Sequence, residues 1–309
     1  MRHRNAGSSD NRFTQRGTSV RKRMTGLAKI GSVALVIALL FGHAVLTSTW
    51  ANEQDGTVVG LTYDPGTDAL LKVYARVLYR STDQGKSWQK IAIAPLKDGR
   101  ISGLAASPAG KGIMYIAGLG VGVLRSDDGG RTWVERNEGL PSRDVIAVAA
   151  HTTQPDTAYA VLKDQGFYRS QDGGQSWRLM DRTSQQGVRQ LIHSNMAGSM
   201  QTGWLFAATS KGVRRVMDCF CLWQTAGKLD GQAYAVTYDP GEPKHLYAAT
   251  EKGLFSGSDG GENWIQMKSP TSEIVGLVFT RSGILFAVNG DSDLYRSDDG
   301  GTKWTKVNA

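Results

Sequence analysis

The stretch Leu78–Trp88 reads LYRSTDQGKSW, and variants of it recur along the chain. The recurrences are LRSDDGGRTW (124–133), FYRSQDGGQSW (167–177), RRVMDCFCLW (214–223), LFSGSDGGENW (254–264) and LYRSDDGGTKW (294–304). Their closing tryptophans are 45, 44, 46, 41 and 40 residues apart. A period of about 40–50 residues matches one four-stranded propeller blade and is too long for leucine-rich repeats.

The residues between these stretches predict strands. Each repeat opens on an apolar run: VVGLTY (58–63), ISGLAA (101–106), VIAVAA (145–150), VRQLIH (188–193), AYAVTY (233–238) and IVGLVF (274–279). A turn rich in Pro, Gly or Asp follows, and then three further short runs, the last of them after the tryptophan. Short β-branched and aromatic runs between turn signals are typical of strands. We therefore predict an all-β, six-bladed β-propeller, with blades at about 57–92, 100–137, 144–181, 187–226, 232–268 and 273–309.

The repeated motif is S-x-D-x-G-x-x-W, in which each residue type has a physical reason. Ser and Asp side chains hydrogen-bond the backbone of their own turn, Gly permits positive φ, and Trp packs into the blade. These roles are structural, so we expect the aspartates to be neither metal ligands nor catalytic acids. The motif residues are Ser81, Asp83, Gly85 and Trp88; Ser126, Asp128, Gly130 and Trp133; Ser170, Asp172, Gly174 and Trp177; Asp259, Gly261 and Trp264; and Ser297, Asp299, Gly301 and Trp304.

This motif resembles the Asp box of bacterial-neuraminidase-repeat propellers, and the resemblance covers residues 57–309. In character the chain is similar to the photosystem II assembly and stability factor family, to sortilin-type ectodomains and to other exported repeat proteins. The resemblance implies a protein partner, for which a membrane protein or a precursor being matured is a candidate. It lies in the repeats alone and carries over no partner-specific surface.

The net charge of +8 is concentrated at the N-terminus. Residues 1–29 carry eight basic side chains and one acidic one, whereas the remainder is nearly neutral. We therefore predict no nucleic-acid partner. Residues 30–51 contain no charged side chain, and their apolar core of 17 residues lies between the length of a signal peptide and that of a spanning helix. The predicted organisation is a basic cytoplasmic leader (1–29), a signal anchor or signal peptide (30–51) and a propeller (52–309).

Positive charge stays in the cytoplasm, so the propeller is expected on the outer side of the membrane. An uncleaved N-terminal helix would hold it on a bacterial inner membrane, facing the periplasm. Cleavage after Ala51, where small residues occupy the −3 and −1 positions, would instead release it into the periplasm. Translation from Met24 would favour cleavage, because it gives a leader of ordinary signal-peptide shape.

The residues that enter the innermost strands of a propeller line one mouth of its channel. Alignment of the six opening runs places polar side chains there, and convergent polar groups on a rigid scaffold predict a binding site for a small ligand or a protein. The alternative is that these strand ends are simply solvated. The predicted mouth residues are Arg100, Asp144, Arg189, Gln232, Tyr234 and Glu273.

The fourth repeat departs from the motif: Val216 and Phe220 replace Ser and Gly. This repeat also holds both cysteines, Cys219 and Cys221, for which an oxidising compartment favours a disulfide. The alternative is a soft-metal site for Cu(I), with Cys219, Cys221, Met217 and His193 as weak candidates. We expect the disulfide, no metal and no cofactor.

The sequence favours a non-catalytic, protein-binding scaffold over an enzyme. A sialidase-like site needs three arginines, but only Arg100 and Arg189 are well placed. A glycosidase needs two carboxylates about 5–9.5 Å apart, whereas Asp144 and Glu273 fall three blades apart. The alternatives that stay open are a sialidase-like or other glycoside hydrolase and a periplasmic copper-binding protein.

Overall fold

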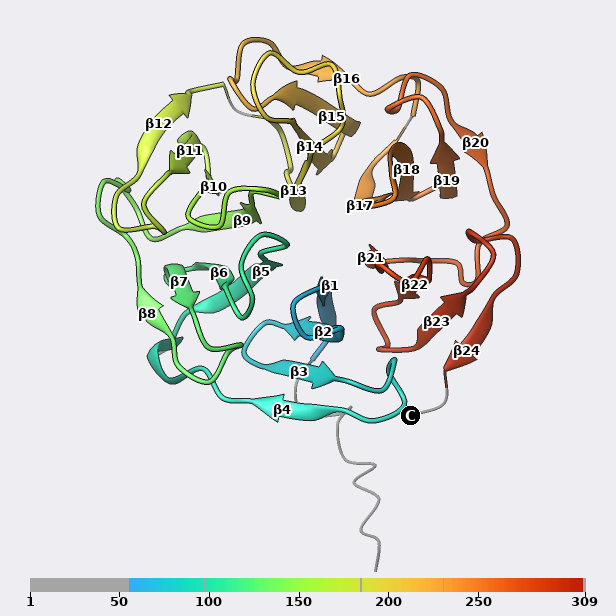
Figure 1. Cartoon of the computed structure of the whole chain (residues 1–309), viewed down its shortest axis with the longest axis horizontal. Helices are drawn as coiled ribbons and strands as arrows, with labels where there is room; N and C mark the ends of the chain where they lie inside the picture. Colours follow the sequence, from blue (N-terminus) through green and yellow to red (C-terminus); the bar gives the residue numbers. More distant parts are fainter. Residues whose placement is uncertain (1–55, 97, 184, 230, 308–309) are drawn as a thin grey trace, which may run out of the picture. The chain divides into compact units, whose positions relative to one another are not determined.

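The structure, a computed structural model, confirms the predicted six-bladed β-propeller; it describes residues 56–307 apart from 97, 184 and 230. Six four-stranded antiparallel sheets surround a central axis (Figure 1). The predicted leader and the apolar segment 30–51 lie outside the described residues. Within the described ranges, no helix is long and apolar enough to cross a membrane.

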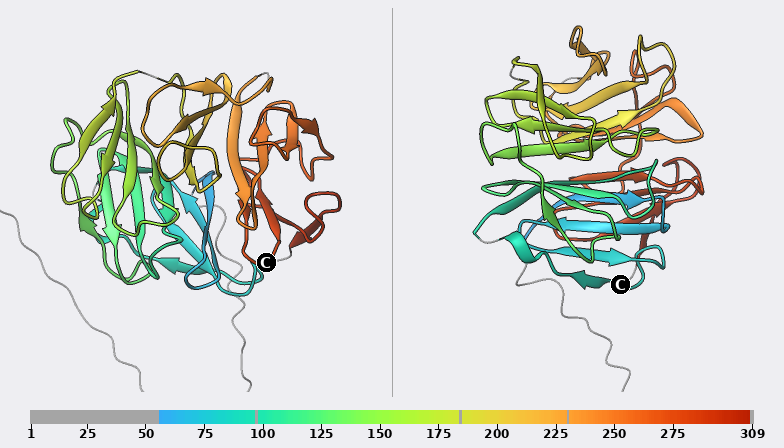
Figure 2. Two further views of the ribbon diagram at one scale, coloured as in Figure 1. Left: turned by 45° about the horizontal axis from the view of Figure 1, so that its top comes forward. Right: turned by 60° about the vertical axis from the view of Figure 1, so that its left-hand side comes forward.

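Every blade consists of four strands that are consecutive in the chain, with the first strand innermost (Figure 1). Neighbouring blades pack face to face, as the side views in Figure 2 show. The strands of blades 1 and 2 are β1 (Val58–Asp64), β2 (Ala69–Tyr74), β3 (Leu78–Ser81), β4 (Gln89–Ile91), β5 (Arg100–Ala106), β6 (Met114–Leu119), β7 (Gly122–Ser126) and β8 (Val134–Glu135), and a 3-10 helix, η1 (Ala94–Leu96), joins the two blades. Those of blades 3 and 4 are β9 (Val145–Ala150), β10 (Ala158–Leu162), β11 (Gly166–Ser170), β12 (Arg178–Asp181), β13 (Gln190–Ser194), β14 (Trp204–Thr209), β15 (Gly212–Met217) and β16 (Gln224–Thr225). Those of blades 5 and 6 are β17 (Ala233–Asp239), β18 (Glu242–Thr250), β19 (Gly253–Gly257), β20 (Ile265–Gln266), β21 (Gly276–Phe279), β22 (Leu285–Val288), β23 (Leu294–Ser297) and β24 (Thr305–Val307).

The motif turns lie between the third and fourth strands and hold the hydrogen bonds that the residue types predict. In the second blade, the Ser126 hydroxyl donates to Asp128 (2.8 Å) and accepts from the Gly130 amide (2.8 Å). Hydrogen bonds from the hydroxyl and amide of Thr132 lower the pKa of Asp128 to about 2. Gly130 has a φ of +90°, a conformation that glycine adopts without steric cost. The carboxylate is therefore committed to its own turn.

Two of the motif tryptophans also donate a hydrogen bond to the preceding blade, whereas Trp133 and Trp304 donate to carbonyls of their own turns. Trp177 is 4 % exposed, and its indole nitrogen donates to the carbonyl of Arg136 in the preceding blade (2.9 Å). Trp264 donates in the same way to Ala226 (2.8 Å). Truncation of a buried Trp typically costs about 3–5 kcal/mol, so these residues contribute to blade-to-blade cohesion as well as to the interior of each blade.

Among the described residues no strand is exchanged between blades 1 and 6. The ring is closed by packing, by side-chain bonds and by the Val58 amide, which donates to the Gly290 carbonyl (3.3 Å). A Cβ on Gly276 of β21 would lie 2.7 Å from the Leu61 amide nitrogen of β1, which shows how closely the two inner strands approach. Further out, the buried ammonium of Lys72 donates to the Ser292 hydroxyl (2.8 Å) and lies 4.2 Å from the centre of the Trp88 ring. The Tyr74 hydroxyl is 2.7 Å from the same Ser292 oxygen.

Burial lowers the pKa of Lys72 from 10.5 to about 8. The contribution of Lys72 to the free energy of unfolding is therefore expected to depend on pH. Below pH 8 the folded protein keeps the full cost of burying the charged amine, and this cost falls as the pH rises towards the unfolded pKa. Relative to a Lys72→Met variant, the wild type should therefore gain about 2 kcal/mol of unfolding free energy between pH 7 and pH 10. Urea denaturation of both proteins across this range measures the difference, and a constant difference would contradict the assignment.

Candidate functional site

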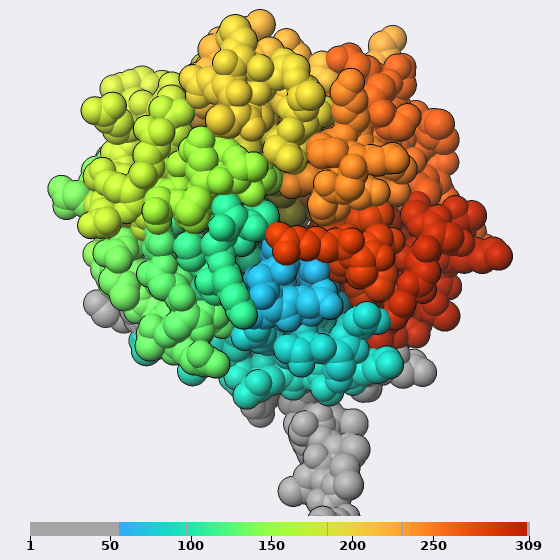
Figure 3. All heavy atoms as spheres, in the orientation of Figure 1, coloured from blue at the N-terminus to red at the C-terminus, as the bar shows by residue number. Residues whose placement is uncertain are grey.

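The six inner strands surround a channel that is hollow at both ends. At the end where these strands begin, a strand-start cavity of about 30 Å³ lies beside Val59, Ser102 and Arg189. At the end where they finish, a strand-end cavity of about 170 Å³ is lined by residues of all six blades. Figure 3 shows the small central hollow on the face that it views. Because a water molecule needs only about 10–15 Å³ of such space, the first cavity holds one or two waters and the second a small organic group.

Three of the six predicted mouth residues come together at the strand-start end. The Arg189 guanidinium lies 5.0 Å from the centre of the Tyr234 ring, a cation–π geometry. With the Gln232 amide oriented so that its oxygen faces Arg189, it accepts hydrogen bonds from Nε (2.5 Å) and Nη2 (2.6 Å). Arg189 is exposed and precedes β13, whereas its two partners belong to the next blade. We call these three residues the mouth cluster.

The other three mouth residues do not join the mouth cluster. Asp144 is exposed and accepts from the Gly120 amide of blade 2 (3.0 Å), so it fastens a neighbouring turn. Arg100 and Glu273 are exposed, and none of the hydrogen bonds or ion pairs among the described residues connects them to the other four. The predicted ring of six is thus a cluster of three and three separate side chains.

A groove opens next to the mouth cluster, between the β10–β11 turn and the segment that precedes β13. Its volume is about 410 Å³, and its lining includes Val188, the residue before Arg189. The floor is apolar and the rim is polar: Ile146, Val161, Phe167 and Val188 form the floor, and Lys163, Asp164, Gln185 and Gln186 lie at the rim. An apolar centre with a polar rim is the usual anatomy of a protein-binding surface.

A second group of polar residues is buried between blades 3 and 4. His151 follows β9, His193 lies in β13, and Asp218 follows β15; all three are at most 3 % exposed. We call them, together with Thr202, the histidine cluster. The two imidazole centres are 3.9 Å apart, and the His193 ring is parallel to that of Tyr159.

The backbone determines where the protons lie in the histidine cluster. His151 Nδ1 accepts from the amides of Thr153 (3.1 Å) and Gln154 (3.1 Å), as the Asp64 carboxylate accepts from Gly66 in the equivalent turn of blade 1. His193 Nδ1 accepts from the Thr152 amide (3.3 Å). Each neutral ring therefore carries its proton on Nε2.

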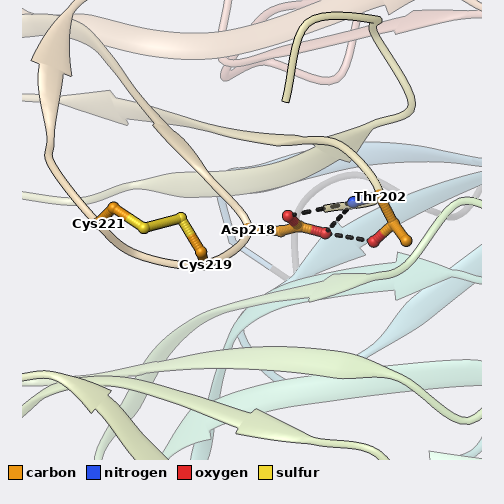
Figure 4. The surroundings of a disulfide bond; sticks show 4 residues. All are labelled: Thr202, Asp218, Cys219 and Cys221. Carbon is orange, nitrogen blue, oxygen red and sulfur yellow. Dashed lines mark hydrogen bonds between the residues drawn. A yellow bond between two sulfur atoms is a disulfide. The ribbon is translucent and has the colours of Figure 1, made fainter. Parts of the chain in front are cut away.

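These Nε2 protons point towards Asp218. His151 Nε2 donates to the Thr202 hydroxyl (2.7 Å), which in turn donates to Asp218. His193 Nε2 lies 3.8 Å from Asp218 Oδ2 and, among the described residues, has no hydrogen-bond partner. Figure 4 shows the carboxylate held by the hydroxyl and amide of Thr202. Asp218 thus keeps the motif position but turns inward.

The two cysteines follow Asp218 directly and are joined by a disulfide (Figure 4). Neither sulfur is then a thiolate, which removes the two strongest ligands of the alternative soft-metal site. The Phe220 between them has a φ of +58° and packs on Phe167 and Tyr159. The bridge spans only three residues, so its role is to shape this turn rather than to cross-link distant parts of the chain.

The potential ligand atoms of His151, His193 and Asp218 lie within 4.8 Å of one another, so they form a candidate metal site. The hydrogen bonds of the two imidazoles argue against a bound metal ion. A ligating imidazole normally donates its other N–H to an acceptor, whereas both Nδ1 atoms here accept backbone amides. The cluster fits a buried proton network that replaces the lost Asp box.

Sequence reasoning singled out His193 only as a weak metal candidate and missed His151 and Thr202. A signal for His151 exists: it occupies the turn position held by Asp64 in blade 1 and Asp239 in blade 5. Its contact with blade 4 is not visible in the sequence, because it joins residues 51 and 67 positions apart.

Comparison with known proteins agrees with the fold. A family model described as BNR/Asp-box repeat matches residues 79–90, and no curated protein matches the chain. Among solved structures, the GH74 xyloglucanase from Xanthomonas campestris is similar with a TM-score of 0.59 and 17 % identity, over 83 % of this chain and 46 % of that one. The chain therefore spans about half the length of that enzyme.

Two structures of the protein YCF48 are also similar. The first, YCF48 bound to D1 peptide, has a TM-score of 0.56 and 18 % identity and is covered over 82 % of both chains. The second, YCF48 from Cyanidioschyzon merolae, has a TM-score of 0.53 and 18 % identity, over 82 % of this chain and 87 % of that one. At such identities, the similarity shows a shared fold.

The histidine cluster predicts loss of stability in mild acid. Burial, with the neighbouring His193, lowers the pKa of His151 to about 4, so the folded protein resists a proton that the unfolded chain takes up near pH 6.5. Between pH 7 and pH 5 the wild type should lose about 1–2 kcal/mol more unfolding free energy than a His151→Gln variant. Denaturant titrations measure this, and an NMR titration of His151 with a midpoint near 6.5 would contradict it.

Proposed function

We propose that this chain is a non-catalytic propeller that binds a segment of another protein on the face where its inner strands begin. The observation that carries the proposal is the mouth cluster. Tyr234 and Gln232 hold the exposed guanidinium of Arg189 in one orientation, so its remaining N–H groups are available to a partner. A preorganised arginine beside an aromatic ring is a frequent energetic centre of protein interfaces.

The shape of this face supports a macromolecular partner. The strand-start cavity below the cluster has about 30 Å³, so a ligand that contacts Arg189 must lie across the face rather than enter the channel. The groove of about 410 Å³ beside Arg189 offers an apolar floor for one or two side chains. Its rim supplies amides and both signs of charge, which suit the polar edge of an interface.

A hydrolase finds less support. Neither channel cavity has an Asp or Glu in its lining within the described residues, and only Asp164 lines the groove. Hydrolysis of glycosides by the usual route needs two carboxylates that face one bond. The motif aspartates do not supply them, because hydrogen bonds commit those carboxylates to their own turns.

The N-terminal leader supports a location for the proposed function. We infer that residues 30–51 export the propeller and hold it at a bacterial inner membrane facing the periplasm, or release it there after cleavage. The concentration of basic residues in 1–29 supports this orientation. The partner is then an exported or membrane protein, for which the similarity in fold to YCF48 bound to D1 peptide is a precedent.

Site-specific photo-crosslinking in cells tests the proposal. A photoreactive amino acid at Gln186, at the rim of the groove, should trap a discrete protein adduct. The same amino acid at Lys86, in a motif turn at the opposite end of the blades, should not. Arg189→Glu should reduce the Gln186 adduct at least about tenfold, because it reverses the charge at the interface, and the adduct should weaken with added salt.

Two results would contradict the proposal. One is that the photoreactive amino acid gives the same adducts at Gln186 as at Lys86, because the partner would then not bind preferentially to the strand-start face. The other is an adduct that persists unchanged in the Arg189→Glu variant while circular dichroism shows that this variant is folded.

A further inference from the structure

The strand-end cavity lies at the opposite end of the channel from the mouth cluster and has a different chemical character. Its wall is built from the last residues of the inner strands and from the turns that follow them. Aromatic rings and proline rings dominate the rim: Tyr63, Tyr238 and Phe279, with Pro65, Pro108 and Pro240. Leu104, Leu191 and Leu277 lie deeper. The interior is thus mainly apolar and shaped by rigid side chains, and its polar lining residues are Thr62, Gln190, His193 and Thr237.

The volume sets the size of the group that fits. An apolar cavity of about 150 Å³ in a protein interior accepts benzene, and this one has about 170 Å³. Sites for drug-sized ligands usually have about 300–1,000 Å³. The strand-end cavity therefore accommodates one phenyl or branched alkyl group. It is too small for a disaccharide or for a peptide segment of several residues.

Arg281 adds a fixed positive charge at the rim. Its Nη1 donates to the Pro65 carbonyl (3.2 Å) and its Nη2 to the Pro108 carbonyl (3.2 Å), so one side chain of blade 6 spans to blades 1 and 2. Both acceptors are neutral, and neither the cavity lining nor the ion pairs of the described residues supply a carboxylate to Arg281. Asp68, at the same rim, accepts instead from the Tyr63 hydroxyl (2.6 Å).

We propose that the strand-end cavity binds an apolar carboxylate: a phenyl or branched alkyl group enters the cavity, and the carboxylate pairs with Arg281. The guanidinium has five N–H donors, of which these carbonyl bonds engage two, and a carboxylate accepts such donors in pairs. The apolar group displaces water from a wall of aromatic and aliphatic side chains. This site is separate from the mouth cluster, so its occupancy does not depend on the protein partner proposed above.

Calorimetric titration of the purified full-length chain tests the site with 3-phenylpropanoate and its neutral amide. The acid should bind at least about tenfold more tightly than the amide, because only the acid pairs with Arg281. Arg281→Gln should remove this preference. Arg131→Gln makes the same charge change on an exposed side chain of a motif turn and should leave binding unaltered. Thr237→Leu, which fills the cavity without breaking a side-chain hydrogen bond among the described residues, should abolish binding of both probes.

Peptides distinguish the two sources of such a group. A hexapeptide that ends in Phe with a free carboxylate, compared with its C-terminal amide, asks whether the cavity accepts the end of a polypeptide. Binding of the free-acid peptide at least as tightly as 3-phenylpropanoate assigns the site to polypeptide ends, and weaker binding assigns it to small acids. Absence of binding by both acids up to about 5 mM, or equal effects of Arg281→Gln and Arg131→Gln, overturns the proposal.

Discussion

The ring must close without a shared strand, and the rest of the structure depends on this constraint. Each blade of the described structure is completed by its own four strands, so the chain links consecutive blades at five interfaces, whereas non-covalent contacts hold the interface between blades 6 and 1. Closure therefore needs inner strands that approach closely, which Gly276 of β21 permits where it faces Leu61 of β1. It also needs the hydrogen bond between the Lys72 ammonium of blade 1 and the Ser292 hydroxyl of blade 6. A rigid channel with two fixed ends is the consequence.

The fold could be predicted because the residues that determine each motif turn are close together in the sequence and the motif recurs along the chain. A motif turn involves residues within about ten positions of one another, and its hydrogen bonds, as between Ser126 and Asp128, form inside that window. Six copies at blade spacing then determine the number of blades.

The sites could be predicted only in part, because they are built between repeats. Alignment of inner strands placed Arg189, Gln232 and Tyr234 at one mouth, and these three do meet. The alignment could not show that the Asp144 carboxylate accepts a hydrogen bond from the Gly120 amide instead. That contact depends on where the β6–β7 turn of the neighbouring blade lies relative to Asp144. The histidine cluster is harder still, because its members come from two blades and three separate turns.

Loss of the motif residues Ser and Gly in blade 4 is directly related to the presence of the histidine cluster. In the intact motifs the carboxylate faces its own turn, where hydroxyl and amide donors satisfy it. Without the Ser and Gly of the motif, the turn after β15 is shaped by the disulfide and Phe220, and Asp218 faces the interior. A carboxylate buried there requires donors, and Thr202 and the Nε2 protons of His151 and His193 face it. Since His193 also lines the strand-end cavity, blade 4 with its altered motif contributes a residue of the histidine cluster to the wall of the channel's apolar end.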